Sequence, residues 1–246
     1  MPTGTIWLLP TTLGGADVAA VIPDSVLERV RRLRYFLVEE PKSARAFLKL
    51  AGHPGPLSQL RIERLTNDTT ARELAAMIDV VLGGMDAGVL SEAGCPAVAD
   101  PGATLVRLAH QANVRVVPLT GPSSPILALM ASGLETQRFA FHGYLPIKEP
   151  ARSRAIRALE LRSCSSRETQ IFIETPYRNR ALLSALLNAC KADSLLCVAC
   201  DLTLASEEIS TRSIRIWRNR TSSLEGRPCV FLLLAQPELA RNKNTG

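Results

Sequence analysis

Short apolar runs separated by turn residues recur along the chain, a pattern that is typical of buried strands in an α/β protein. Between them lie helical patterns, such as residues 24–34, where Val26, Leu27, Val30 and Leu33 share one helix face. We expect strands at residues 5–9, 35–38, 87–90, 115–119, 139–144, 169–173, 195–200, 213–217 and 229–234. Further helices are expected from residue 100 onward and at residues 123–132, 152–162 and 177–191.

The order of these elements changes along the chain. The first half alternates strand and helix, which favours a parallel sheet. Near the end, strands 213–217 and 229–234 follow one another with only a polar segment between them, which indicates an antiparallel pair. We therefore predict two α/β domains, residues 1–120 with a mostly parallel sheet and residues 121–246 with a mixed sheet.

Composition narrows the class of protein. Of the 246 residues, 46% are hydrophobic and 21% charged, so the chain can bury a large core and is not a disordered binder. The net charge of +6 permits a polyanionic partner such as RNA without requiring one. No apolar stretch reaches the roughly 18 residues of a membrane span, and the N-terminus shows no signal peptide. We expect no membrane association and a cytoplasmic location.

The six cysteines predict reduced thiols rather than disulfides or a metal site. Cys197 and Cys200 form a C-x-x-C pair inside a predicted strand, where residues three apart point to opposite faces. No second pair accompanies them, so we predict no metal ligands.

Three loops rich in small residues follow predicted strands. The longest, Ser91–Gly102, contains two prolines and two glycines and leads into a helix, and residues 120–125 and 10–15 form similar loops. Open α/β sheets bind ligands at the carboxyl ends of their strands, so these loops predict one shared cleft. The alternative is a tight turn in which Asp100 caps a helix that begins at Pro101. No G-x-G-x-x-G or P-loop motif supports dinucleotide or nucleoside triphosphate binding.

The motifs in these loops carry a family resemblance. Residues 88–146, from GVLSEAGCPAVADPG through LTGPSSP to GYLP, resemble the tetrapyrrole methylase superfamily of S-adenosylmethionine-dependent enzymes. The sequence is most similar to the branch that methylates the ribose 2′-oxygen of small-subunit ribosomal RNA. The segments ETPYR, at residues 174–178, and DLT, at residues 201–203 with Glu207, match that branch further, and the resemblance spans roughly residues 4–236.

The resemblance implies an α/β homodimer whose S-adenosylmethionine lies in a cleft between two domains. Hydroxyl methylation needs a proton acceptor, for which Glu207 is the candidate, and Arg178 could hold an anionic group. Each of the two could equally be an ordinary surface or salt-bridge residue. The cofactor contacts carried over are Pro10, Thr11, Glu92, Ala93, Gly94, Cys95, Gly121, Ser123, Ser124, Tyr177, Leu202, Thr203 and Pro228.

The acceptor is less determined than the methyl donor. Three segments depart from the RNA-methylating branch: residues 11–15, 39–42 and 66–68. Basic residues between Lys148 and Arg167 could follow a phosphate backbone, or could form a solvated helix face. A tetrapyrrole-type methylase and a non-catalytic paralogue that serves as a scaffold therefore stay open beside an RNA methyltransferase.

Overall fold

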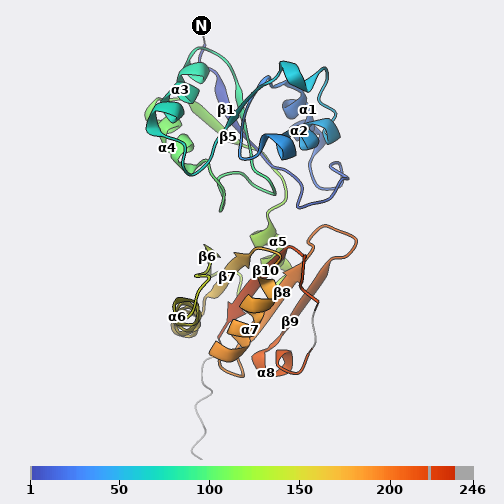
Figure 1. Ribbon diagram of the computed structural model, residues 1–246, viewed down its shortest axis with the longest axis vertical. Helices are drawn as coiled ribbons and strands as arrows, with labels where there is room; N and C mark the ends of the chain where they lie inside the picture. The colour runs from blue at the N-terminus through green and yellow to red at the C-terminus, as the bar shows by residue number, and fades with distance from the viewer. Residues whose placement is uncertain (1, 221–222, 236–246) are drawn as a thin grey trace, which may run out of the picture. The chain divides into compact units, whose positions relative to one another are not determined.

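The computed structural model describes residues 2–220 and 223–235 and divides the chain into two compact units, Met1–Ser123 and Ser124–Gly246 (Figure 1). The sequence analysis placed this division after residue 120. Residues 221–222 of the predicted polar segment, and residues 236–246 of the predicted second domain, lie outside the described residues. Among the described residues, no helix is long and apolar enough to cross a membrane.

Unit 1 contains an entirely parallel five-stranded sheet in the order β3-β2-β4-β1-β5. The central strands are almost wholly buried, since helices cover both faces, and their sequences are continuously apolar for that reason. The strands are β1 (Thr5–Leu9), β2 (Tyr35–Val38), β3 (Arg61–Arg64), β4 (Ala87–Leu90) and β5 (Arg115–Pro118). The sequence-based prediction of a parallel sheet is confirmed.

Side chains of β2 alternate between two cores in unit 1. Phe36 and Val38 pack with α1 (Asp24–Arg32) and α2 (Pro41–Leu50) on one face. Tyr35 and Leu37 pack with α3 (Ala71–Leu82) and α4 (Ala103–Gln111) on the other. This two-sided cover leaves the carboxyl ends of the strands as the edge where loops gather.

Unit 2 contains a mixed sheet in the order β6-β7-β10-β8-β9. Strands β6 and β7 are parallel, and the three other neighbouring pairs are antiparallel, which confirms the predicted mixed sheet. The strands are β6 (Phe139–Tyr144), β7 (Thr169–Glu174), β8 (Leu195–Cys200), β9 (Glu208–Ser213) and β10 (Cys229–Leu234).

Helices cover both faces of this second sheet as well. Phe172 and Phe231 stack at a centroid distance of 6.1 Å in a core built with α6 (Ala151–Ser166), α7 (Asn179–Ala189) and α8 (Ile214–Trp217). On the opposite face, Thr211 of β9 donates a hydrogen bond to the carbonyl of Ser132 in α5 (Ser124–Ser132), at 2.6 Å. Cys200 belongs to the core that contains Phe172 and Phe231, and Cys197 does not, as their spacing on a strand predicted. Among the described residues, no group of histidine, cysteine or carboxylate side chains could hold a metal ion.

One predicted strand is wrong. Residues 213–217 form the end of β9 and the short helix α8, because Ile214 and Trp217, three residues apart, both face the core as a helix requires. The indole of Trp217 donates a hydrogen bond of 2.8 Å to the carbonyl of Leu196, which fixes the helix on the sheet. The predicted pairing of this segment with β10 fails too, since β10 lies between β7 and β8.

Five elements were not predicted: α2, the 3-10 helix η1 (Leu57–Gln59), β3, α3 and, apart from its last residue, β9. A sequence signal for α3 existed, because Thr70 and Glu73 form a capping box in which each side chain bonds the other residue's backbone. Strand β3, with the polar sequence RIER, lies at the sheet edge, where alternation is weak and a strand is hard to recognise.

Candidate functional site

The three small-residue loops of unit 1 follow β4, β1 and β5, which are neighbours in the sheet. They are joined by hydrogen bonds at the carboxyl edge. The backbone N–H of Thr11 donates to the carbonyl of Gly94 at 2.9 Å, and the Cys95 thiol donates to the carbonyl of Pro122 at 3.4 Å. The hydroxyl of Ser91 also donates to the carbonyl of Gly94, at 3.2 Å. The predicted convergence of these loops is therefore observed within unit 1.

Two glycines make this convergence possible. A Cβ on Gly121 would lie 2.2 Å from the Cβ of Pro10, so the β1 and β5 loops approach as closely as they do only because that atom is missing. Gly94 has a φ of +76°, and its missing Cβ would lie 3.1 Å from a Leu13 methyl and 3.3 Å from the Pro122 carbonyl. Both positions therefore need glycine.

The loop after β4 keeps turning beyond Gly94. Ala97 and Ala99 both have a φ of +64°, a conformation that costs a residue with a side chain roughly 1–2 kcal/mol. Helix α4 then begins at Ala103 with Gly102 as its N-cap, and no side chain bonds that helix end. The alternative interpretation of Asp100 as the cap is wrong, because the extra turns place Asp100 before the helix.

Asp100 instead lies among carboxylates at the strand ends. Burial, with charge repulsion from Glu39 and Glu92, raises the pKa of Asp100 to about 6, against the opposing effect of a hydrogen bond from Ser91. Burial likewise raises the pKa of Glu39, with Glu92 adding to the shift. Glu39 directly follows β2, so the acidic groups come from the ends of two neighbouring strands. An aspartate with a pKa about 6 can accept a proton near neutral pH, and the cluster favours a cationic ligand.

In unit 2, a charged network holds the segment between β8 and β9. Arg227 forms ion pairs with Asp201 at 2.8 Å and with Glu208 at 3.1 Å, and it donates to the carbonyl of Ser206 at 2.8 Å. Asp201 and Thr203 adopt φ values of +51° and +70° inside this segment. The network therefore holds two residues in left-handed conformations that glycine would adopt more readily.

The predicted proton acceptor Glu207 lies in the same segment. Its carboxylate is exposed and accepts the backbone N–H of Thr203 at 2.8 Å, so it closes the local turn. Pro228 is also exposed, and its carbonyl accepts the N–H of Asp201 at 2.9 Å. Leu202 is buried. Four predicted residues of unit 2 are therefore neighbours: Leu202, Thr203, Glu207 and Pro228.

Arg178 and Tyr177 follow the end of β7, beside the start of β10. Burial opposes ionisation of Glu174, but the ion pair with Arg178 at 2.7 Å keeps the pKa of Glu174 below its ordinary value. Tyr177 is 79% exposed, which is unusual for a tyrosine outside an interface or binding site. Asn179 donates from its amide to the Arg227 carbonyl at 2.6 Å, which ties this end of β7 to the Arg227 network.

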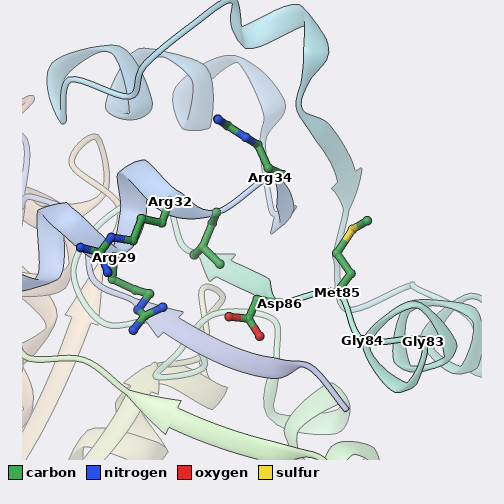
Figure 2. Close-up of a pocket in the computed structure, with 8 residues that line it drawn as sticks. Arg29, Arg32, Arg34, Gly83, Gly84, Met85 and Asp86 are labelled. Atoms are coloured by element: carbon green, nitrogen blue, oxygen red, sulfur yellow. The ribbon is translucent and has the colours of Figure 1, made fainter. Parts of the chain in front are cut away.

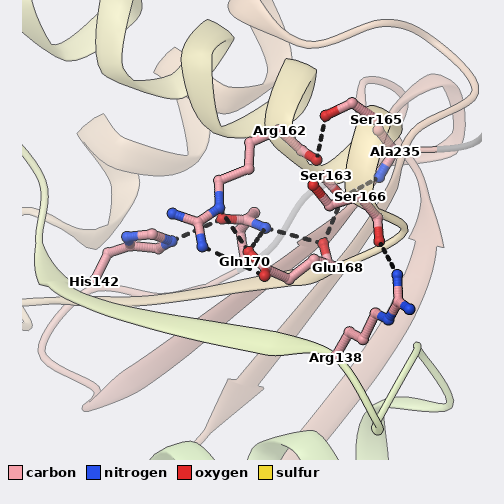
Figure 3. Close-up of polar contacts among 9 residues, drawn as sticks. All are labelled: Arg138, His142, Arg162, Ser163, Ser165, Ser166, Glu168, Gln170 and Ala235. Atoms are coloured by element: carbon pink, nitrogen blue, oxygen red, sulfur yellow. Dashed lines mark hydrogen bonds and ion pairs between the residues drawn. The ribbon is translucent and has the colours of Figure 1, made fainter.

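The basic residues on and around α6 differ in how they are paired. Arg162 bonds Glu168 at 2.7 Å, beside the buried Gln170, whose side-chain oxygen accepts a hydrogen bond from the His142 ring (Figure 3). Arg152 pairs with Glu149 at 3.1 Å. Arg154 and Arg157 are exposed and form no ion pair with any described residue. Within α6, the arginines of the strip that no described carboxylate neutralises are therefore Arg154 and Arg157, and the exposed Lys148 and Arg167 beside the helix also form no ion pair with a described residue.

The sequence of the chain was compared with known families and proteins. No family model matches the chain. A protein of Streptococcus pyogenes serotype M6 named "Ribosomal RNA small subunit methyltransferase I" is 30% identical over 212 residues, which cover 86% of the chain and 69% of that protein. The chain belongs to the ribosomal RNA small subunit methyltransferase I family. The family resemblance read from the loop motifs is thereby confirmed.

Members of this family differ in how much of their length the chain matches. A member from Mesorhizobium japonicum with the same name is 37% identical over 139 residues, which cover 56% of the chain but only 46% of that protein. Among solved structures, the methyltransferase CobJ aligns with a TM-score of 0.64 at 16% identity, covering 95% of each chain. This likeness confirms the predicted α/β fold class.

The predicted cofactor residues fall into two groups, one in each unit. Unit 1 holds Pro10, Thr11, Glu92, Ala93, Gly94, Cys95, Gly121 and Ser123. Unit 2 holds Ser124, Tyr177, Leu202, Thr203 and Pro228.

The sequence analysis did not identify Glu39 and Arg227 as candidate site residues. Glu39 was noted only as part of a departure from the RNA-methylating branch, and Arg227 lies in a polar segment without periodicity.

Proposed function

We propose that the chain is an S-adenosylmethionine-dependent methyltransferase that acts on the ribose 2′-hydroxyl of small-subunit ribosomal RNA in the cytoplasm. The observation that carries the proposal is the convergence of the three loops at Gly94 and Gly121, in a chain that belongs to a family of this name. The substrate follows from the names of the relatives and from the loop motifs most similar to the RNA-methylating branch.

The unit 1 loops have the chemistry that this cofactor needs. S-adenosylmethionine supplies an electrophilic methyl group on a positively charged sulfonium, beside a charged amino group. Glu39, Glu92 and Asp100 offer negative charge at the same strand ends, which favours a cation. Glu92 and Ala93 are exposed, so their backbone can be reached by a ligand. An enzyme of this kind gains most of its rate by aligning donor and acceptor, for which rigid loops are suited.

Calorimetric titration with S-adenosylmethionine and with its demethylated product tests the cofactor directly. Transfer of a labelled methyl group to isolated small ribosomal subunits tests the acceptor. Binding without transfer to the subunits would redirect the search to a small tetrapyrrole-type acceptor, whereas absence of both binding and transfer would leave a scaffold protein.

Replacing Gly94 with valine should weaken S-adenosylmethionine binding at least tenfold, or about 1.4 kcal/mol. A β-branched residue at a φ of +76° is strained, and its methyl groups would crowd Leu13 and the Pro122 carbonyl that bound the loop. Calorimetry measures the change.

Gly55 provides the matched control for this substitution. It lies in unit 1, has a φ of +86°, and has nothing within 4 Å of the position of a Cβ. Gly55→Val carries similar backbone strain away from the loops and should leave cofactor affinity unchanged. Equal effects of the two substitutions would remove the β4 loop from the proposed site.

If RNA follows α6, reversing the charge of Arg154 and Arg157 together should weaken RNA binding and leave S-adenosylmethionine affinity intact. Each phosphate that the chain no longer binds should also lower the salt dependence of binding, by a slope of about 0.7 for single-stranded RNA. Binding of a labelled RNA over a range of salt concentrations measures both quantities. The control is the Arg72→Glu/Arg107→Glu pair, which reverses two exposed arginines of unit 1 that form no ion pair with described residues. No difference between the two pairs would make the α6 arginines a solvated surface only.

A homodimer belongs to the same proposal, through the family resemblance. Light scattering of the purified chain at micromolar concentration should give about twice its 26.6 kDa mass. A mass equal to that of one chain would contradict it.

A further inference from the structure

A basic cavity of about 440 Å³ lies at the amino edge of the unit 1 sheet (Figure 2). Arg34 directly precedes β2 and Asp86 directly precedes β4, whereas the converging loops follow the carboxyl ends of the strands. Strand β2 has four residues, so about 13 Å of extended chain separates the two edges. The cavity is therefore distinct from the loops proposed to bind the cofactor. Its lining consists of Arg29, Arg32, Leu33, Arg34, Gly83, Gly84, Met85 and Asp86.

The charge in this cavity is not balanced. The lining holds three arginines and one carboxylate, and that carboxylate is already engaged: Asp86 accepts the backbone N–H of Thr5 at 2.8 Å and the Trp7 indole at 3.1 Å. The pair of Arg32 with Glu28 is long, at 3.8 Å, and both side chains are more than 60% exposed, so it contributes little. Arg34 forms no ion pair with any described residue.

Local structure accounts for only part of this charge. Arg29 stacks over the Trp7 ring at 3.9 Å, and Arg29 and Arg32 lie in the last turn of α1, where cations favourably meet the helix dipole. Arg34 lies beyond that helix, so neither a ring nor a helix end explains it. Several guanidinium groups along one cavity without close carboxylate partners suit an extended row of phosphates, whose oxygens each guanidinium can bind in pairs.

We propose that this cavity, which we call the amino-edge cavity, binds backbone phosphates of RNA. The proposal rests on the proposed function in taking RNA as the substrate. Arg32 and Arg34 are exposed, and such groups hold a small anion weakly because water competes for them. A polyanion gains affinity at exposed arginines by releasing its counterions, which favours an RNA strand over free phosphate or a nucleotide. An RNA bound here would be anchored by unit 1 away from the methyl-transfer loops.

The test compares Arg32→Glu/Arg34→Glu with the control pair Arg72→Glu/Arg107→Glu, using a fluorescent single-stranded RNA of mixed sequence. We expect the amino-edge pair to weaken RNA binding by about tenfold or more near physiological salt, and to lower the salt slope by about 0.7 for each phosphate that is no longer neutralised. The control pair should change affinity far less. Arg34→Gln serves as a milder variant, with a smaller loss in the same direction, in case the double reversal does not fold.

Two measurements separate this inference from the proposed function. Calorimetry with S-adenosylmethionine should give the same affinity in the wild-type chain and the amino-edge pair, and loss of RNA binding together with intact cofactor binding supports the proposal. Equal RNA affinity in the amino-edge and control pairs overturns it. A third outcome would assign the cavity to a small anion instead. In that case, inorganic phosphate or adenosine monophosphate at micromolar concentration would displace the RNA probe from the wild-type chain. Arg34→Gln would abolish this displacement and leave the affinity for RNA unchanged. A wild-type chain that binds cofactor but no RNA overturns the inference and leaves the methyl donor standing.

Discussion

Gly121→Ala should destabilise unit 1 by about 3 kcal/mol and abolish measurable cofactor binding. The new Cβ would lie 2.2 Å from the Cβ and 2.3 Å from the Cγ of Pro10, and neither loop can move away without breaking the hydrogen bond that joins it to the loop after β4. The Gly121 backbone is not in the left-handed region, so the effect isolates crowding from backbone strain. Urea unfolding and calorimetry measure the two losses.

A second substitution, Pro10→Gly, tests whether the contact with Pro10 causes the loss of stability. Pro10→Gly removes both crowding atoms, so the double variant Gly121→Ala/Pro10→Gly should be more stable than Gly121→Ala alone, although Pro10→Gly by itself raises the entropy of the unfolded chain. Such a reversal of sign occurs only between residues in contact. Additive effects of the two changes would show that the loops do not meet as the structure places them.

Arg227→Met should destabilise unit 2 by about 2–3 kcal/mol, somewhat less than the roughly 3–5 kcal/mol for breaking a fully buried ion pair, since the Arg227 side chain is 22% exposed. The substitution leaves the Asp201 carboxylate, which is 9% exposed, without its cation. It also removes the bonds to Glu208 and to the Ser206 carbonyl. Because the chain has one tryptophan in each unit, Trp217 fluorescence in a Trp7→Phe background follows unfolding of unit 2 alone.

Asp201→Asn provides the partner change. Asparagine adopts the φ of +51° at this position more readily than other residues with side chains, and it removes the stranded charge. The double variant Asp201→Asn/Arg227→Met should therefore recover part of the stability lost in Arg227→Met. If Arg227→Met alone matches the wild-type chain in urea, the network is a surface feature without a role in holding the β8–β9 segment.

The sequence was a good guide where burial decides the structure. Helices pack on both faces of each sheet, so the inner strands are apolar on both faces. Continuous apolar runs therefore predicted five strands: β1, β2, β4, β8 and β10. Residues 213–217 were misassigned because a run of isoleucine and tryptophan fits a strand as well as a single helical turn. Only the placement of Trp217 against Leu196 distinguishes the two.

The candidate site shows a different limit. Small residues at three strand ends predicted that the loops meet, since parallel strands bring their carboxyl ends to one edge. The raised pKa of Asp100 depends on burial and on the charge of Glu39, which lies 61 positions earlier in the chain. Arg227 was invisible for the same reason, as its partners Asp201 and Glu208 become neighbours only when β10 pairs with β8.

The distribution of thiols gives the chain its own chemical reporters. Four of its six cysteines, Cys190, Cys197, Cys200 and Cys229, are buried in unit 2, whereas Cys95 and Cys164 are partly accessible. An alkylating reagent should therefore modify the accessible pair in the folded chain and reach the other four only in molecules whose second sheet has opened. The mass added to each chain then counts opening events one molecule at a time. Because Cys95 lies in the loop after β4, protection of its thiol by a ligand reports occupancy of that loop in the same spectrum.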